Sequence, residues 1–419
     1  MQTAMQTIKN SRTIRHGYIA LIVIACVGLF SLQGCGVDTT THVRSYLGVP
    51  IAHEDIQAFL QERMKTLHIP GASLVVINEG TIVYHHNVGF ADQERHIPIT
   101  DSTIFEVASL SKSVFASFVM TFVQSGELSL DKPLHEYMPH PDLVHDPRHK
   151  LLTARMVLSH RTGLPNWREN EKDSILRFTF EPNSKYGYSG EAYQYLAMVL
   201  CHIAKTDDTG LDSIFQARIA KPMGVRTMTF IQTPYTRAHK AQPYTSKGTL
   251  IDWAHDYWVK KEDGKFYAPS SVHTTSRDFA QWMIALMRGA VLSPAMYQEL
   301  WKPHSEVPYS GLTVNYTLGF SHLELPATNL LLHSGDNVGF TAWYVFDPDR
   351  EWGFVITMNS NGGEQLGEEL IFYFLLSPHI KVLAGGFVII LIAVFVGIGI
   401  GIRSLLRRRN QKKYSPMHS

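Results

Sequence analysis

The chain has 419 residues, of which 45% are apolar and 18% charged, an ordinary composition for a globular protein with one elaborated domain or two. Three of its 38 basic residues lie in residues 1–36 and seven in 381–419, which leaves 28 in the middle against all 37 acidic residues, a net charge of −9. So acidic a body excludes nucleic acid as an expected partner, and three cysteines are too few for a disulfide framework.

The N-terminal residues have the form of a secretion signal. An apolar run from Tyr18 to Leu32 follows three basic residues and is too short to cross a membrane comfortably. The run ends in LQGC, which resembles the lipobox of bacterial lipoproteins, whose cysteine is acylated. We therefore predict a signal peptide of lipoprotein type over residues 1–35, with Cys35 as the lipidation site, and a linker over 36–50. An uncleaved membrane anchor is the alternative.

Helix and strand patterns follow the linker. Apolar residues at helical spacing predict a helix that begins near His53 and stops at Pro70 and Gly71. The next stretch, ASLVVINEGTIVYHHNVGFAD, indicates two strands joined at Glu79 and Gly80.

The stretch FEVASLSKSVFA, residues 105–116, places a serine and a lysine three residues apart in the first turn of a predicted amphipathic helix. Residues three apart are neighbours on a helix, so Lys112 can approach Ser109 but points away from Ser111. Ser109 lies at the positive end of the helix dipole, where an alkoxide or an oxyanion is favoured. The S-x-x-K pattern is that of a nucleophile with an amine base. The alternative is the polar face of a helix, because this short pattern also arises by chance, and Ser129 and Lys132 in SLDK form a second match in a loop.

The far end of this region returns to strands. TAWYVFDPDREWGFVITMNS indicates a strand pair that turns at Asp347 to Arg350, and EQLGEELIFYFLL indicates a closing helix. Between the two ends lies a mostly helical region, about residues 127–314. We therefore predict an α+β fold over residues 51–376: an antiparallel sheet built from both ends of the catalytic region and flanked by helices, with an inserted, mostly helical subdomain.

A second apolar run follows that region. Val382 to Ile402 is 21 residues without a charge, long enough to cross a hydrocarbon core of about 30 Å. The tail 403–419 is basic, and by the positive-inside rule it lies in the cytoplasm. We therefore predict a C-terminal transmembrane helix over 382–402. The catalytic region is then expected on the periplasmic or extracellular side of the plasma (inner) membrane.

A serine nucleophile needs a base and an oxyanion site. YGYSGEAYQ places Tyr188 in a glycine-flanked loop directly before a helix, where a phenol can be held in a cleft. LLHSGDNVGF places His333, Ser334 and Gly335 on a strand, with a glycine that permits close approach of another backbone. Taken singly, each residue is better explained as a packed tyrosine or a solvated histidine, because the chain has 18 Tyr and 21 His.

The order of these three segments resembles the class C β-lactamase and D-alanyl-D-alanine peptidase superfamily of serine hydrolases, which includes related esterases. The resemblance covers about Ile51 to Leu376, with further landmarks in SLDKPLHEYMP, MVLSHRTGLP, TTSRDFAQWM and YTLGF. It implies a β-lactamase/transpeptidase-like fold and hydrolysis through an acyl-enzyme, with neither a metal nor another cofactor.

The resemblance implies a role for the residues around the serine. Ser109 would be the acylated nucleophile, and Lys112 and Tyr188 would share the roles of general base and general acid. A free lysine or tyrosine titrates near pH ~10, so burial or mutual charge effects must lower one of the two pKa values before either takes the serine proton at neutral pH.

The resemblance also assigns roles on the strand. The backbone N–H groups of Ser109 and Asp336 would form the oxyanion hole, with Ser334 and Gly335 lining the oxyanion and substrate site. His333 would replace the lysine of the Lys-Thr-Gly version of this motif. There it would orient a substrate carboxylate or polarise the tyrosine.

The sequence departs from the family pattern at Gly190, where enzymes of this group usually carry an asparagine whose amide holds the acylamide of the substrate. The neighbouring Glu191 accepts hydrogen bonds but cannot donate them as an amide does. We therefore expect weak cephalosporin hydrolysis, while esterase or amidase activity on other acyl substrates is retained.

Other classes of function fit less well. The chain lacks the nucleophile elbow G-x-S-x-G of α/β-hydrolases, and the histidines of HPDLVHDPRHK do not have the spacing of a compact zinc motif. The main alternative is a penicillin-binding protein or β-lactam sensor that deacylates slowly or not at all. We expect a membrane-anchored, extracytoplasmic serine hydrolase that cleaves an amide, ester or β-lactam in a small-molecule or peptidoglycan-type acyl substrate.

Overall fold

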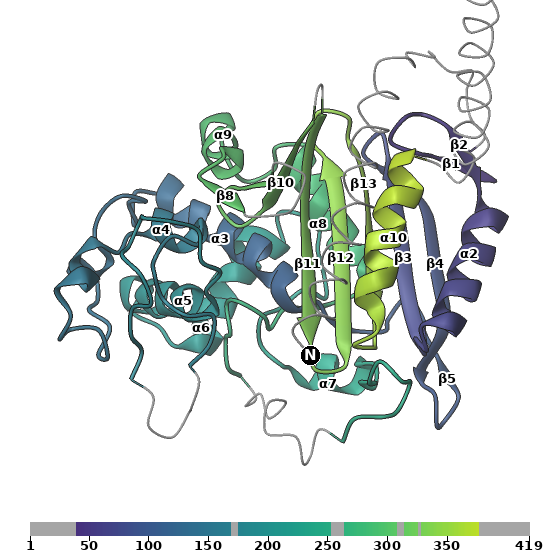
Figure 1. Ribbon diagram of the computed structural model, residues 1–419, viewed down its shortest axis with the longest axis horizontal. Helices are drawn as coiled ribbons and strands as arrows, with labels where there is room; N and C mark the ends of the chain where they lie inside the picture. Colours follow the sequence, from purple (N-terminus) through teal and green to yellow (C-terminus); the bar gives the residue numbers. More distant parts are fainter. Residues whose placement is uncertain (1–38, 169–174, 253–263, 308–313, 326–327, 377–419) are drawn as a thin grey trace, which may run out of the picture.

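The computed structural model describes residues 39–168, 175–252, 264–307, 314–325 and 328–376. Its centre is a nine-stranded sheet with the strand order β5-β4-β3-β13-β12-β11-β10-β9-β8, in which all neighbours are antiparallel (Figure 1). The strands are β3 (Gly71–Asn78), β4 (Thr81–Asp92), β5 (Ile97–Pro98), β8 (Ser305–Val307), β9 (Val314–Tyr316), β10 (Ser321–Leu325), β11 (Thr328–Asn337), β12 (Phe340–Asp347) and β13 (Trp352–Met358). Two short ladders lie outside it: β1 (His42–Arg44) with β2 (Pro50–Ala52), and β6 (Phe105–Glu106) with β7 (His273–Thr274).

The two ends of the catalytic region meet in the middle of the sheet. Strand β3, near the beginning, pairs with β13, near the end, with Val75 opposite Val355. On the other side of β13 follow β12 and β11, which carries the predicted oxyanion segment. The prediction of an α+β fold whose antiparallel sheet comes from both ends is confirmed.

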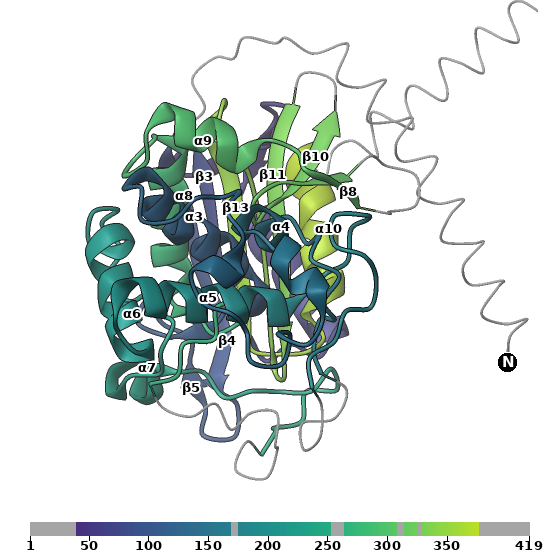
Figure 2. The same cartoon turned by 90° about the vertical axis from the view of Figure 1, so that its left-hand side faces the viewer.

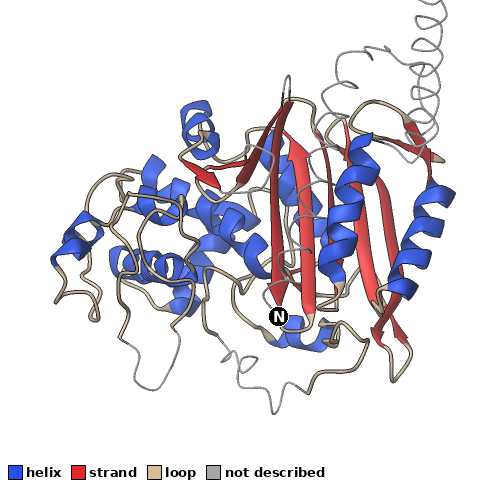
Figure 3. Ribbon diagram, viewed as in Figure 1, coloured by secondary structure: helices blue, strands red, loops and turns tan. Residues whose placement is uncertain are grey.

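Helices cover both faces of the sheet (Figure 3). Helices α2 (His53–Thr66) and α10 (Gly363–Leu376) pack on one face, and α3 (Ser111–Gln124) and α8 (Ser276–Met287) on the other. Strand β3 is apolar on both sides because it is buried twice: Leu74 contributes to the α2–α10 core and Val75 to the α3–α8 core.

A helical layer adjoins α3 on the side away from the sheet, and Figure 2 shows α4, α5 and α6 in front of the sheet. Its elements are η2 (Leu134–Glu136), η3 (Pro147–Leu151), α4 (Ala154–Leu158), α5 (Gly190–Ala204), α6 (Asp208–Phe215), the π-helical turn η4 (Gln216–Ala220) and α9 (Pro294–Trp301). Helix α7 (Pro234–His239) lies below the ends of the central strands in Figure 1. Aromatic rings join this layer to α3. Phe115 of α3 packs edge-on against Phe230, which stacks on Phe266 with a centroid distance of 4.2 Å. Strands β7 and β8 lie within the range 127–314 that the sequence assigns to helices.

Local signals place several boundaries. The β3–β4 hairpin turns at the predicted pair, Glu79 (φ 52°) and Gly80 (φ 63°), and two successive positive φ angles are what a two-residue turn between twisted strands requires. Helix α2 ends at Thr66, four residues before the predicted stop at Pro70, and His68 (φ 53°) takes the chain out of the helical conformation.

The predicted signal peptide with Cys35 and the predicted transmembrane helix at 382–402 lie outside the described residues. Among the helices that the structure does describe, none combines the length and apolar character needed to span a bilayer.

Candidate active site

The site lies where the segment before α3 meets the edge of β11. Strand β10 pairs with β11 only as far as Leu332, so the following residues of β11 are free of that neighbour. The 3₁₀ turn η1 (Ala108–Leu110) packs against this part of β11. A Cβ added to Gly335 would lie 2.5 Å from the carbonyl oxygen of Val107 and 2.8 Å from the backbone nitrogen of Ser109. Only glycine allows this approach.

The sequence spacing predicts Ser109 in the first turn of the α-helix, but in the structure Ser109 lies in η1, before that helix begins. The difference arises at Ala108, whose φ of 49° turns the backbone before α3 begins at Ser111. A positive φ in a residue with a Cβ is uncommon and costs free energy, and such residues cluster at functional sites. The 3₁₀ turn still places the side chains of Ser109 and Lys112 on the same side of the backbone.

Lys112 provides an amine next to the serine hydroxyl. Its Nζ lies 3.2 Å from Ser109 Oγ and donates to the carbonyl oxygen of Pro269 at 3.0 Å. The side chain is fully buried in the first turn of α3, and this burial lowers the pKa of Lys112 to about 7. A substantial fraction of this amine is therefore neutral at neutral pH.

Tyr188 is the third residue of the candidate site, beside Ser109 and Lys112. Its ring lies against the amine, with Lys112 Nζ 4.5 Å from the ring centroid. Burial raises the pKa of the Tyr188 phenol, and the side chain of Ser109 offsets only part of that increase. The structure therefore brings together the three residues that the sequence proposes as nucleophile, amine and phenol, with the phenol protonated.

The neighbouring serines have structural contacts instead. The Ser111 hydroxyl is buried, donates to the carbonyl oxygen of Ala108 at 2.5 Å and accepts from the backbone N–H of Val272 at 2.9 Å. The Ser113 hydroxyl donates to the carbonyl oxygen of Gly319 at 2.6 Å. These bonds hold η1 and α3 in place.

His333 lies beside the site as a neutral imidazole. Burial is the main cause that lowers its pKa to about 3, and the charge of Lys112 adds to it. Its Nδ1 lies 2.6 Å from the carbonyl oxygen of Ser334, so Nδ1 carries the proton, and Nε2 accepts from the hydroxyl of Tyr316 at 3.0 Å. Both nitrogens are engaged, and the ring centroid lies 6.4 Å from that of Tyr188.

The side chains of Ser334 and Asp336 are directed to the opposite face of β11 from His333. They pair with Trp343 and Thr341 of β12, and Trp343 belongs to the core under α10. Strand alternation accounts for this placement, because successive side chains point to opposite faces. The backbone of these residues, rather than their side chains, lies nearest to η1.

His160 was not proposed from the sequence, although it lies in the landmark MVLSHRTGLP. It is completely buried with φ 56°, and its ring centroid lies 4.2 Å from that of Tyr188 and 4.7 Å from that of Tyr316. Its Nδ1 accepts from the backbone N–H of Ser189 at 3.1 Å. Burial lowers the pKa of His160 well below the usual value, so the ring that packs against Tyr188 is neutral.

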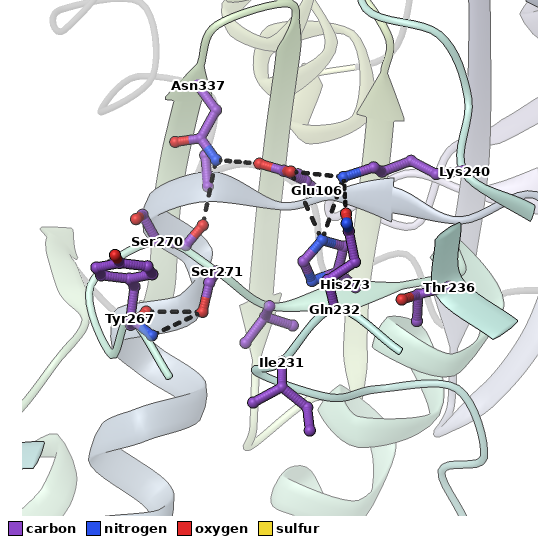
Figure 4. A network of polar contacts seen from close by, with 12 residues as sticks. Glu106, Ile231, Gln232, Thr236, Lys240, Tyr267, Ser270, Ser271, His273 and Asn337 are labelled. Carbon is purple, nitrogen blue, oxygen red and sulfur yellow. Dashed lines mark hydrogen bonds and ion pairs between the residues drawn. The ribbon is translucent and has the colours of Figure 1, made fainter. Parts of the chain in front are cut away.

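A buried polar network lies behind the serine (Figure 4). Glu106, three residues before the nucleophile, accepts from Lys240 Nζ at 2.9 Å and from Asn337 Nδ2 at 2.7 Å, one bond to each carboxylate oxygen. Lys240 also donates to Gln232 Oε1 at 2.7 Å, and its Nζ lies 3.4 Å from His273 Nε2. Bonds in which donor and acceptor are both charged are stronger than neutral ones.

This network fixes three catalytic segments relative to one another. Asn337 follows Gly335 by two residues on β11, and its amide also donates to the carbonyl oxygen of Ser270 at 3.2 Å. Ser270 follows Pro269, whose carbonyl oxygen accepts from Lys112. The Glu106 carboxylate thus connects strand β11 with the segment that leads to Ser109. Through Asn337 it is also connected to Ser270, next to the residue that accepts from Lys112.

Gly190 is the first residue of α5, directly after the helix cap formed by Ser189, whose hydroxyl accepts from the backbone N–H of Ala192. The neighbouring Glu191 is not free to replace an amide, because its carboxylate accepts from Arg168 Nε at 3.1 Å. Arg168 also donates to Asp142 at 2.7 Å.

A sequence model of the family described as Beta-lactamase matches residues 56–375. Protein flp of Staphylococcus aureus (strain MW2) is 21% identical over 334 residues, which cover 74% of this chain and 64% of that protein. The chain therefore spans less than two thirds of the length of this relative. Esterase EstB of Burkholderia gladioli is 27% identical over 220 residues, 45% of this chain and 55% of the esterase.

Two solved structures are similar in fold. The octameric penicillin-binding protein homologue from Pyrococcus abyssi has a TM-score of 0.63 at 20% identity, over 74% of each chain. The D-alanine carboxypeptidase AmpC from Burkholderia cenocepacia has a TM-score of 0.63 at 18% identity, over 77% of this chain and 99% of that one. The shared arrangement is the antiparallel sheet with helices on both faces.

Proposed function

The chain belongs to the beta-lactamase family, and from this premise we propose that it is a serine hydrolase that forms an acyl-enzyme on Ser109 with an ester, amide or β-lactam substrate. One observation carries the proposal. The amine of Lys112 lies 3.2 Å from Ser109 Oγ, and burial lowers its pKa to about 7. Such an amine is a suitable general base near neutral pH, because part of it is neutral and its conjugate acid can return the proton.

In the acylation step, the neutral amine of Lys112 takes the proton of Ser109 as Oγ attacks the carbonyl carbon of the substrate. The oxyanion that forms is stabilised by the backbone N–H groups of Ser109 and Asp336, at the contact between η1 and β11. The leaving group receives the proton from Lys112 by way of the Tyr188 hydroxyl, which burial keeps protonated. Water then attacks the acyl-enzyme with the same groups in reverse order.

Uncharged acyl substrates are favoured over β-lactams and D-alanyl peptides. Penicillins, cephalosporins and peptide C-termini carry a carboxylate, which calls for a cation or a free donor in the site. His333 is neutral and both of its nitrogens have protein partners, so it offers neither. Similarity to Esterase EstB supports an ester as the substrate.

The alternative is a penicillin-binding protein or β-lactam sensor that keeps its acyl group. The likeness in fold to the penicillin-binding protein homologue from Pyrococcus abyssi supports this alternative.

Two measurements on the purified protein test the proposal. A fluorophosphonate probe should label the peptide that contains Ser109, and Ser109→Ala should abolish labelling, while Ser129→Ala, in the other S-x-x-K sequence, should leave it unchanged. p-Nitrophenyl acetate should be hydrolysed over many turnovers. Release of one equivalent of nitrophenol per protein, followed by a stop, would support the sensor instead.

We further propose that the catalytic region is held at the outer face of the plasma membrane. The apolar runs on both sides of it support this location, as does the contrast between the basic ends and the acidic middle of the chain. Acylated Cys35 and the span 382–402 would be the two attachments.

A further inference from the structure

The space beside Gly190 is filled by the side chain of Trp167. A Cβ added to Gly190 would lie 2.7 Å from Cη2 of the indole and 3.0 Å from Cζ2 and Cζ3. No residue with a side chain fits there while the indole keeps its place. Trp167 therefore occupies the space that a side chain at position 190 would take.

The indole lies on the catalytic side of this segment. Ser189 is extended, with φ −142° and ψ 113°, so the Cβ directions of residues 188 and 190 point to the same side. The hydroxyl of Ser189 points the other way, where it donates to the carbonyl oxygen of Pro165 at 2.8 Å. The indole that fills this space therefore lies on the side of the segment to which Tyr188 is directed, and the Tyr188 ring lies against the Lys112 amine.

The backbone on both sides of Trp167 is held against α5. The carbonyl oxygen of Asn166 accepts from the backbone N–H of Gly190 and of Glu191, each at 3.1 Å, and its Oδ1 lies 3.0 Å from the Gly190 nitrogen. Arg168 is bound through its ion pairs with Glu191 and Asp142. Trp167 is nevertheless 44% exposed, so a large apolar ring faces solvent from a fixed position on the Tyr188 side of the segment.

We infer that Trp167 forms one wall of the acyl-binding site and selects substrates whose acyl group is apolar and preferably aromatic, against acyl groups that carry an amide. The inference rests on the proposed serine hydrolase function. A flat aromatic acyl group gains contact area and ring packing on the indole. The indole has one N–H donor and no acceptor, so the amide of an acylamino group placed against its face loses hydrogen bonds to water without replacement.

The first test compares two esters with the same leaving group, p-nitrophenyl phenylacetate and p-nitrophenyl acetate. Trp167→Ala should lower the ratio of their kcat/KM values about tenfold, the order of discrimination that one apolar contact surface gives, and Trp167→Phe should keep most of it. Phe372→Ala serves as the matched control, since this aromatic residue is 39% exposed on α10, on the opposite face of the sheet. It should leave the ratio unchanged.

The second test adds the p-nitrophenyl ester of N-acetylglycine, whose acyl group contains an amide. Gly190→Asn alone should lower kcat/KM for all three esters, because the new side chain collides with the indole. In the Trp167→Ala background the same substitution should raise the preference for the N-acetylglycine ester severalfold. Thermal melting of each variant identifies those that do not fold.

The outcomes separate the inference from the function on which it rests. If the unmodified protein hydrolyses the esters but Trp167→Ala and Trp167→Phe change all of them by the same factor, the indole has only a structural role and the inference is wrong. If the unmodified protein hydrolyses none of the three and the fluorophosphonate probe leaves Ser109 unlabelled, the proposed function itself fails.

Discussion

At the scale of single residues, burial has opposite effects on the two titratable groups next to Ser109. It lowers the pKa of Lys112 to about 7 and raises that of Tyr188. In both residues burial disfavours the charged form, which is the ammonium of Lys112 and the phenolate of Tyr188. Groups whose pKa values are moved apart in this way divide the acid and base roles. In the proposed mechanism Lys112 is therefore the base, and Tyr188 keeps a proton to pass on.

The activity should depend on pH through this amine. We expect kcat/KM for p-nitrophenyl acetate to rise with pH, with a midpoint near 7, and to level off above it, because only neutral Lys112 can accept the serine proton. Lys112→Arg should lower kcat/KM by about 10²- to 10⁴-fold, since a guanidinium stays protonated. A profile that is flat across this range would show that another group is the base.

The same burial should lower the stability of the fold. The Lys112 amine has a pKa of about 7 in the folded state, against an ordinary value of ~10.4 when unfolded, so the unfolded chain holds more protons between these pH values. Stability therefore rises with pH across this window and is lowest below it. Lys112→Met should raise the free energy of unfolding by about 1 to 4 kcal/mol at pH ~6.5, and the gain should shrink as the pH approaches ~10. Chemical denaturation at the two pH values measures this, and Lys132→Met, at an exposed lysine, should show no such trend.

At the scale of elements, the sequence predicts what depends on neighbouring residues. The hairpin at Glu79 and Gly80 and the spacing of Ser109 and Lys112 are local patterns, and both are present in the structure. Glu106 reads in the sequence as an ordinary charged residue before a helix. Its partners lie 134 residues away at Lys240 and 231 residues away at Asn337, a separation that periodicity and spacing cannot relate.

The contact between η1 and β11 should tolerate no side chain at its centre. Gly335→Ala places a methyl group 2.5 Å from the Val107 oxygen and 2.8 Å from the Ser109 nitrogen, which pushes the oxyanion segment away from the serine. Loss of one oxyanion donor costs about 10²- to 10³-fold in kcat, and we expect a decrease of this size. Gly126→Ala is the control, because its Cβ would meet nothing within 4 Å although its φ is 77°. It should lower stability slightly and leave kcat unchanged.

The buried pair of Glu106 and Lys240 should show strong coupling. Glu106→Gln removes the charge that faces the buried Lys240 ammonium, and breaking such a pair costs about 3 to 5 kcal/mol. Lys240→Met in the same chain should restore much of this loss, because no unmatched charge then remains. A double-mutant cycle of urea denaturation gives the coupling. Additive effects of the two substitutions would contradict the role given to this pair.

At the scale of the whole molecule, the proposed attachment at both ends can be tested by accessibility. Protease added to intact spheroplasts should digest the catalytic region and leave intact an epitope tag placed after Ser419. Cys35→Ala should abolish incorporation of labelled fatty acid, and Ser31→Ala, a small residue before the lipobox, is its control. Protection of the catalytic region from the protease would show that the charge argument gives the wrong orientation.

The order of the strands also decides when during synthesis a functional site can exist. Ser109 leaves the ribosome early, but the strand that completes its oxyanion site ends at Asn337, and β13, which joins β12 to β3, ends at Met358. For most of its translation a nascent chain therefore has the β3–β4 hairpin without the strand that pairs with the other edge of β3. Pairings between such distant segments form slowly, which under the proposed outer location would leave time for the chain to cross the membrane before it folds. The site around Ser109 would then be complete only after synthesis of the sheet has finished.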